Sequence, residues 1–135
     1  MKFTSTLNND EALNLLSYYH TTKDNVNTER LYFKIVSSSV FVKLIEEKVC
    51  ISSSDKAKKG VKEILSLASG RKPSQIKNSD RLRIDLRISP NIHSRLFRPF
   101  NRLLKILGSR KIIRSKEVLA CKKVEDCIKL IINNL

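Results

Sequence analysis

The chain has 135 residues, of which 41% are hydrophobic, and its 27 basic and 13 acidic side chains give a net charge of +14. This length predicts one domain with a modest core, so we do not expect a second independent domain. So large a positive charge is atypical of a housekeeping enzyme and indicates an acidic partner, such as nucleic acid, anionic lipid or an acidic protein surface. The alternative is that the charges are simply solvated.

The cysteine content and the N-terminal sequence predict a cytoplasmic protein. Three cysteines, at Cys50, Cys121 and Cys127, form an odd set that is too sparse for a disulfide scaffold. Asp10 and Glu11 stand where a secretory signal would have its apolar region. No stretch approaches the roughly 18 apolar residues of a membrane span, so we expect at most peripheral contact with an anionic membrane.

Charge divides the chain into two parts. Residues 1–55 hold six basic and seven acidic side chains, a net charge of −1, whereas residues 56–135 hold 21 and six, a net charge of +15. We therefore expect an N-terminal extension over 1–55 and a basic helical part over 56–135, together forming one compact unit. A partner-binding surface should lie in the second part.

The N-terminal part predicts one helix and a small β element. A helix that ends near Thr21 is indicated by apolar residues at helical spacing, namely Ala12, Leu15, Leu16 and Tyr19. Runs of β-branched and aromatic residues at 31–36, 40–45 and 49–52 favour a hairpin or meander. The alternative is that Ser39 caps a short helix with Val40, Phe41, Leu44 and Ile45 on one face.

The predicted fold class is accordingly mainly α, of the α+β type. A short exposed β element could pair with its copy across a two-fold axis, so a homodimer is one expectation for the N-terminal part.

The second part begins with a helix that Ser54 or Asp55 caps and Gly70 ends, with an inward stripe of Ala57, Val61, Ile64, Leu65 and Ala68. Residues 73–80 read as a loop. Leu82, Ile84 and Leu86 alternate with charged residues, as in a short strand or an extended loop, and Ser89 to Asn91 is a turn or a helix start. A last helix is predicted from about Val124, with Val124, Ile128, Ile131 and Leu135 facing inward.

Between these elements lies an amphipathic helix with a cationic face. Its apolar stripe is Ile92, Leu96, Phe100, Leu103 and Leu107. Pro99 must either kink this helix or mark its first turn, which would place the start near Phe97. A second stripe and the segment that follows supply the predicted partner-binding residues, namely Arg95, Arg98, Arg102, Lys105, Arg110, Lys111 and Arg114.

Residues 56–135 resemble an acyl carrier protein-like domain, a small helical bundle. Residues 60–65 are similar to the family's first helix, and 73–82 to its long loop. Asp85 and Leu86 are similar to the pair that precedes its second helix, and residues 123–128 to the start of its last helix. The resemblance implies a three-to-four-helix bundle of the kind that carries a prosthetic group.

Two departures separate the chain from that family. Carrier domains attach phosphopantetheine to a serine that opens the second helix, but Pro90 stands at the equivalent position. Ser89 lies one residue early and Ser94 four residues late, and helix capping explains a serine there more simply. We therefore expect no cofactor, and a true carrier modified on Ser89 or Ser94 is the third alternative. The second helix is typically acidic in carriers, whereas residues 86–116 hold nine basic and no acidic side chains.

Neither catalysis nor a metal site is predicted. His20 and His93 stand in no motif with a nucleophile or an acid, and Cys121 and Cys127 have no second ligand pair. The sequence therefore predicts a non-enzymatic adaptor that presents its cationic helix to an acidic protein. Nucleic acid is the alternative partner, because nine of the ten arginines lie within residues 71–114 and guanidinium groups suit phosphate.

Overall fold

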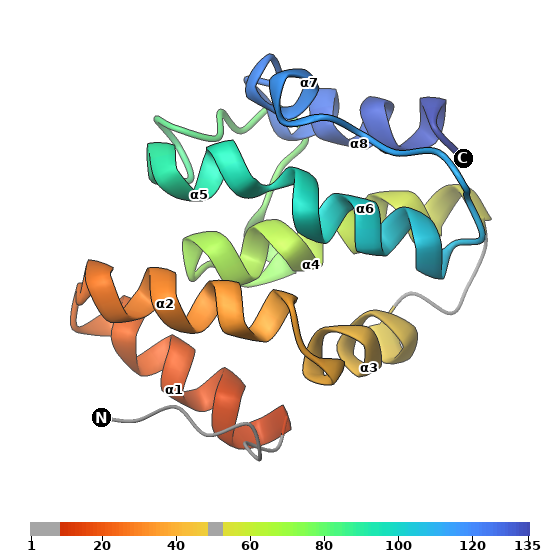
Figure 1. Cartoon of the computed structure of the whole chain (residues 1–135). Coiled ribbons are helices and arrows are strands. Elements are labelled where there is room, and N and C mark those ends of the chain that lie inside the picture. The colour runs from red at the N-terminus through yellow and green to blue at the C-terminus, as the bar shows by residue number, and fades with distance from the viewer. Residues whose placement is uncertain (1–8, 49–52) are drawn as a thin grey trace.

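The computed structural model describes residues 9–48 and 53–135, which form eight α-helices, a short 3₁₀-helix (η1) and connecting turns (Figure 1). The helices are α1 (Asn9–Thr21), α2 (Asn25–Val36), α3 (Ser39–Lys48), α4 (Ser53–Ser69), η1 (Pro73–Gln75), α5 (Pro90–Arg95), α6 (Phe97–Ile106), α7 (Ser115–Leu119) and α8 (Val124–Asn133). The prediction of a mainly helical protein is confirmed. The predicted helix that ends near Thr21 is α1, and its Leu16 and Tyr19 are buried.

The predicted β element is wrong, because residues 31–36 and 40–45 belong to α2 and α3. The third predicted run, 49–52, lies outside the described residues. No strand occurs in the described ranges, so the sheet-edge route to a homodimer has no strand there to use.

Helix α2 forms because its buried residues follow helical spacing and its first turn is capped. Asp24 precedes the helix and accepts a hydrogen bond from the Asn27 backbone N–H at 3.2 Å. The strand predicted from Leu31 left out this cap. The strand preference of the β-branched residues near the end of α2 is outweighed by the burial of one helix face. The buried side chains are Thr28, Leu31, Tyr32, Ile35 and Val36.

Helix α3 is the alternative that the sequence left open, and it is confirmed. The four residues predicted to share one face, Val40, Phe41, Leu44 and Ile45, are all buried. The helix starts at Ser39, but the side chain that caps it is that of Ser38, whose Oγ accepts from the Val40 N–H at 3.2 Å.

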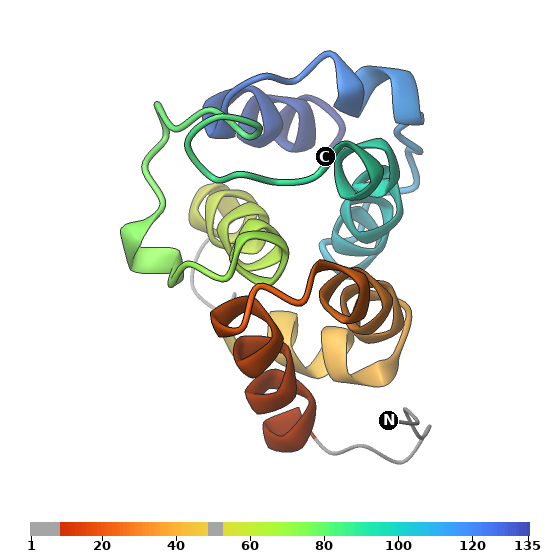
Figure 2. The same cartoon turned by 90° about the vertical axis from the view of Figure 1, so that its left-hand side faces the viewer.

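Helix α4 is the centre of the fold, and Figure 2 looks nearly along it with the other helices arranged around it. It packs against α2, α3, α6 and α8. The predicted inward stripe is buried, and Gly70 ends the helix with a φ of +79°. The helix begins at Ser53, so Ser54 and Asp55 lie within its first turn and the prediction that one of them caps it is wrong.

The N-terminal helices are tied to the later part of the chain by polar contacts as well as apolar ones. Glu29 of α2 accepts hydrogen bonds from Ser89 Oγ at 2.7 Å and from Asn91 Nδ2 at 2.9 Å. His20 of α1 hydrogen-bonds through Nε2 to the Leu67 carbonyl oxygen of α4 at 2.9 Å. The two parts on either side of residue 55 therefore differ in charge, but their helices are in contact.

Residues 81–88 form a turn where the sequence predicted a strand or an extended loop. In a strand, Leu82, Ile84 and Leu86 would lie on one face. Leu82 and Leu86 are buried, but Ile84 is 62% exposed, so the three side chains do not share a face. The Asp85 and Leu86 backbone N–H groups both bond to the Arg81 carbonyl oxygen. Arg81 makes one antiparallel bridge with Lys123, which places the turn beside the start of α8.

The start of α8 at Val124 is confirmed, with Asp126 accepting from the backbone N–H groups of Lys122 and Lys123 at 3.1 Å. Three of the four predicted inward residues are buried, but Leu135 is 46% exposed because the helix ends before it. Helix α7 was not predicted. Within the described ranges, no helix is both long and apolar enough to cross a membrane.

Candidate binding surface

The cationic face is built on α5 and α6, which run as one broken helix across the molecule (Figure 1). Pro99 is the third residue of α6 and lacks the N–H that would bond to the carbonyl oxygen of Arg95. The break therefore falls between Arg95 and Phe97, and the predicted start near Phe97 is confirmed for α6.

One side of this broken helix packs against the core, which leaves the opposite, cationic side exposed to solvent. Ile92, Leu96, Phe100 and Leu103 of the predicted apolar stripe are buried, and Leu107 is half-buried. A buried Phe or Leu side chain contributes about 1.5–3 kcal/mol, so this side of the helix is firmly held against the core. Its opposite side, including Arg95, Arg98 and Lys105, is exposed.

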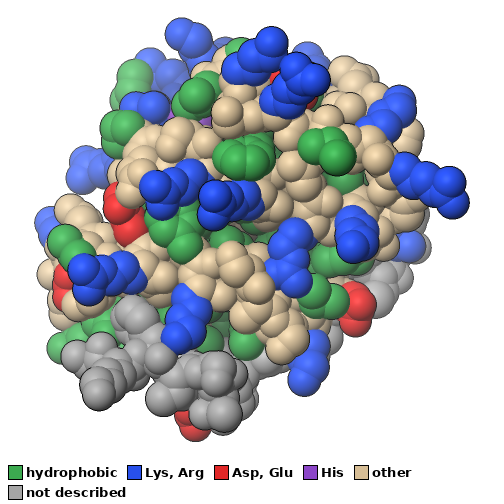
Figure 3. All heavy atoms as spheres, viewed as in Figure 1, with side chains coloured by type: hydrophobic (Ala, Val, Ile, Leu, Met, Phe, Trp, Pro, Cys, Tyr) green, Lys and Arg blue, Asp and Glu red, His purple; other side chains and the backbone are tan. Residues whose placement is uncertain are grey.

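Figure 3 shows Lys and Arg side chains spread over the face on which α5 and α6 lie, with hydrophobic side chains between them and few acidic ones. The seven predicted cations form no salt bridge with an acidic side chain within the described ranges. Three of them lie over aromatic rings: the Arg95 guanidinium is 5.0 Å from the centroid of Phe33, that of Arg98 is 5.8 Å from Phe97 and that of Arg102 is 5.5 Å from Phe41. These rings orient the charges without neutralising them.

The segment after α6 folds back along the helix and brings further cations to it. Gly108 turns the chain with a φ of +89°, a backbone conformation that glycine adopts without strain. Asn101 then holds the returning segment at both polar groups of Ile113: its Nδ2 donates to the carbonyl oxygen at 2.9 Å and its Oδ1 accepts from the N–H at 2.7 Å. Ser109 Oγ also donates to the carbonyl oxygen of Asn134, which ties the segment to the end of α8.

This return creates a pocket of about 420 Å³ between α6 and the segment. Four of the seven predicted residues line it, namely Arg102, Lys105, Arg110 and Lys111. Ile112 forms part of the wall and is 77% exposed, so an apolar side chain stands among the four cations. Arg95, Arg98 and Arg114 lie outside this pocket, along α5 and α6 and at the start of α7.

Arg102 differs from the other cations because the fold uses it. Its Nη1 donates to the carbonyl oxygens of Val36 at 2.6 Å and Ser38 at 3.0 Å, and its guanidinium lies 5.5 Å from the Phe41 ring centroid. These contacts cap α2 and join its end to α6, so Arg102 is a structural residue at the edge of the pocket.

The two serines proposed for modification are both hydrogen-bonded. Ser89 caps α5 by accepting from the Ile92 N–H at 3.2 Å, and its hydroxyl donates to Glu29. Ser94 lies inside α5 and donates to the Asn91 carbonyl oxygen at 2.8 Å, so the capping role suggested for it is wrong. Ser89 thus performs the capping role that the sequence indicated.

The remaining residues considered for chemistry are structural. His93 is buried and bonded at both ring nitrogens, to Arg83 and to Val118. Cys121 and Cys127 are buried free thiols, and the hydrogen bond with the neighbouring Cys121 thiol, together with burial, raises the pKa of Cys127. No group of three or more potential metal ligands occurs among the described residues.

The sequence did not reveal two features that form the pocket. One is the pair of hydrogen bonds by which Asn101 holds Ile113, and the other is the exposed side chain of Ile112. The signal was the adjacent pair Ile112 and Ile113 in a polar segment, since neighbouring residues in an extended segment point in opposite directions. If the segment is extended, this alternation predicts that one of the two isoleucines is exposed.

Comparisons of the chain with models of protein families, with curated proteins and with solved structures find no match.

Proposed function

We propose that the protein is a non-enzymatic binding module that presents the cationic face of α5, α6 and the returning segment to an acidic protein partner. The observation that carries the proposal is the pocket in which Lys105, Arg110 and Lys111 surround the exposed Ile112. An apolar side chain ringed by cations suits a partner segment that combines carboxylates with an apolar anchor. Phosphate groups by themselves offer no apolar surface for that side chain to contact.

The order of elements in the second part of the chain supports a carrier-like scaffold for this module. A long helix α4 is followed by a long connection, the broken helix α5–α6, the short α7 and the final α8. This order agrees with the acyl carrier protein-like resemblance, while the charge of the second helix is reversed. The proposed adaptor therefore uses a carrier-like arrangement with a partner of the opposite sign.

Nucleic acid is the second candidate, favoured by nine arginines within residues 71–114. Guanidinium groups form bidentate hydrogen bonds with phosphate, and contacts to several phosphates would make the affinity fall steeply with salt concentration. Base stacking is not favoured on this face, because Phe100 is buried and Phe97 is half-buried beneath Arg98.

A charge-reversal variant with a matched control tests the surface. Arg98→Glu, Lys105→Glu and Lys111→Glu together change exposed residues of the face, and Lys58→Glu, Lys72→Glu and Lys77→Glu together change exposed residues elsewhere. Each triple variant carries a net charge of +8 in place of +14, because every substitution removes two units. Arg102 is left intact so that the fold is not disturbed.

Binding is measured to four probes across a salt series: an acidic peptide with alternating Glu and Leu, a mixed-sequence DNA duplex, a single-stranded RNA, and vesicles containing phosphatidylserine. We expect the wild type and the control triple to bind the peptide most tightly, and the face triple to lose at least about tenfold. Tighter binding to duplex or RNA, with a log-log salt slope of several units, would establish the nucleic-acid alternative instead. Equal losses in the two triples would show that net charge alone is responsible.

Modification on Ser89 or Ser94 is tested separately by the intact mass after incubation with a phosphopantetheinyl transferase and coenzyme A. We expect the mass to remain unchanged, since Ser89 is engaged by Ile92 and Glu29. A mass increase of one prosthetic group would establish the carrier alternative.

A further inference from the structure

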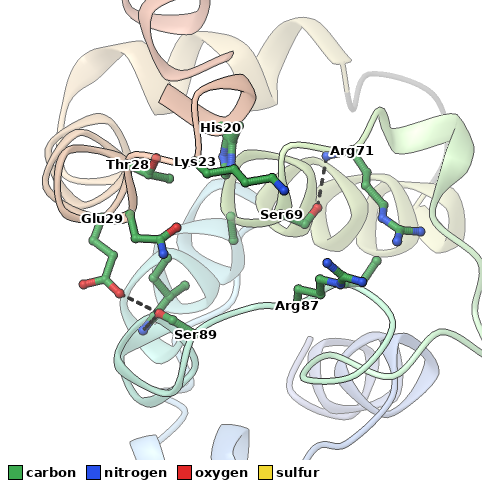
Figure 4. Close-up of a pocket in the computed structure, with 12 residues that line it drawn as sticks. His20, Lys23, Thr28, Glu29, Ser69, Arg71, Arg87 and Ser89 are labelled. Atoms are coloured by element: carbon green, nitrogen blue, oxygen red, sulfur yellow. Dashed lines mark hydrogen bonds between the residues drawn. The ribbon is translucent and has the colours of Figure 1, made fainter. Parts of the chain in front are cut away.

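A second cavity, of about 480 Å³, lies where the turn between α1 and α2, the C-terminal end of α4 and the segment before α5 meet (Figure 4). Its size falls within the roughly 300–1,000 Å³ of sites for small molecules. It shares no residue with the seven cations of the face described above.

Three cations line this cavity, each from a different segment: Lys23 follows α1, Arg71 follows α4 and Arg87 precedes α5. None of them forms a salt bridge with an acidic side chain in the part of the chain that the structure describes. Glu29 also lines the cavity, but its two oxygens accept hydrogen bonds from Ser89 and Asn91. In Figure 4 the three cationic head groups lie toward one side of the view and Glu29 toward the other.

The backbone of all three cationic residues has a defined conformation, and their side chains are exposed. Lys23 has a φ of +58° and Arg87 a φ of +54°, and they are the non-glycine residues with positive φ among those described. This conformation is strained for residues with a side chain. Arg71 is held differently: its N–H donates to Ser69 Oγ at 3.3 Å and its carbonyl oxygen accepts from Ser66 Oγ at 2.6 Å.

Apolar side chains form another part of the wall. Ala68, Leu86 and Ile92 line the cavity and are each at most 5% exposed, so they belong to the core that supports it. The cavity therefore has three cations on its wall and a floor formed by the core, of which only a small apolar area is open to a ligand.

We propose that this cavity binds a small phosphate ester. The phosphate would lie among Lys23, Arg71 and Arg87, because a dianion is stabilised by several cations and matches the fork of a guanidinium. The organic part of the ester would occupy the rest of the cavity above this floor, since a free phosphate would leave most of the volume unused. The proposal goes beyond the cationic face and does not depend on it.

The test is a titration of the ¹⁵N-labelled full chain at 0.15 M salt, followed by backbone amide chemical shifts, with phenyl phosphate, inorganic phosphate and phenol as three separate probes. We expect phenyl phosphate to give saturable shifts at residues 22–24, 69–71 and 86–88, with a dissociation constant below about 1 mM. Inorganic phosphate and phenol should each bind at least about tenfold more weakly.

Arg71→Gln and Arg87→Gln should each raise the dissociation constant of phenyl phosphate at least about tenfold. Arg30→Gln is the matched control, because Arg30 is exposed on α2 and does not line the cavity, and it should change nothing. The same spectra report whether each variant is folded, and Lys23→Gln provides a third variant if one of the arginine variants is not.

Three results would overturn the proposal: no saturable shift with phenyl phosphate at 10 mM, equal binding of inorganic phosphate, or shifts confined to residues 98–112. The face triple variant distinguishes the two sites. It should lose the acidic peptide and retain phenyl phosphate, so either proposal can fail without the other.

Discussion

The Arg102 guanidinium donates a hydrogen bond of 2.6 Å to the carbonyl oxygen of Val36, the last residue of α2. Carbonyl groups at a helix end have no partner within the helix, and a cation there also interacts favourably with the helix dipole. A second bond to Ser38 extends the contact toward the start of α3. A residue predicted as part of the binding surface thus joins the N-terminal helices to α6.

We therefore predict that Arg102→Ala lowers the free energy of unfolding by about 2 kcal/mol, since hydrogen bonds made by charged groups contribute about 1.5–3 kcal/mol. Chemical denaturation of the variant and the wild type measures the difference. Lys105→Ala is the control, because Lys105 is exposed on the same helix and should change stability by less than about 0.5 kcal/mol. Similar stability of the two variants would show that the Arg102 bonds contribute nothing.

Tyr32 illustrates the opposite case, a polar group that the core does not satisfy. Its side chain is fully buried, and its hydroxyl has no hydrogen-bond partner among the described residues. Burial also raises the pKa of Tyr32, since the phenolate cannot be solvated.

We predict that Tyr32→Phe leaves stability unchanged or raises it by about 1 kcal/mol, because the substitution removes a desolvated hydroxyl and keeps the ring. Thermal or urea unfolding measures the change. Tyr18→Phe is the control, since Tyr18 is 58% exposed and its hydroxyl can bond to water. A loss above about 1 kcal/mol in Tyr32→Phe would mean that the hydroxyl has a partner in solution.

The sequence predicted the helices whose pattern is strong and failed where residue preference opposed tertiary packing. The stripe of α4, the cationic helix and the start of α8 all follow helical periodicity, and the structure contains all three. The run at 31–36 was read as a strand because Ile35 and Val36 are β-branched. Its real signal began earlier, with the Asp24 cap and the buried Thr28.

The candidate surface was predictable as a set of charges but not as a shape. Helical spacing placed Arg98 and Lys105 on one side of a helix, and the structure agrees. That Arg110 and Lys111 return to the same pocket depends on the Asn101 clamp, a contact that spacing does not reveal. The sequence does not predict the second cavity for the same reason, since Lys23, Arg71 and Arg87 lie far apart along the chain.

Gly60 of α4 lies directly against Leu103 of α6. A Cβ atom at this position would lie 2.5 Å from Leu103 Cδ1, and Leu103 is fully buried, so it has little room to move. We predict that Gly60→Ala destabilises the protein by about 1–2 kcal/mol, because overpacking outweighs the gain of about 1 kcal/mol in helix propensity.

A double-mutant cycle checks that this cost comes from the one contact. In a Leu103→Ala background the obstructing methyl groups are gone, so Gly60→Ala should become neutral or stabilising. The same destabilisation in both backgrounds would mean that another contact limits the space at Gly60.

His93 should make stability depend on pH. Arg83 Nε donates to its Nδ1 at 2.9 Å, so the ring proton is on Nε2, which bonds to the Val118 carbonyl oxygen at 3.0 Å. A protonated ring would bring a second N–H against Arg83. Burial lowers the pKa of His93, and the Arg83 charge lowers it further, against the opposing effect of the Val118 carbonyl.

Because the folded state resists protonation, the unfolded chain binds the extra proton as the pH falls. The contribution of His93 to stability is complete above its ordinary pKa of about 6.5 and is lost as the pH falls toward the lowered value of the folded state. Urea unfolding between pH 7.5 and 5 should therefore show a decline in stability that is smaller in His93→Gln and in Arg83→Gln. A decline of unchanged size in both variants would place its origin at another group, because neither the titrating ring nor the neighbouring charge would then account for it.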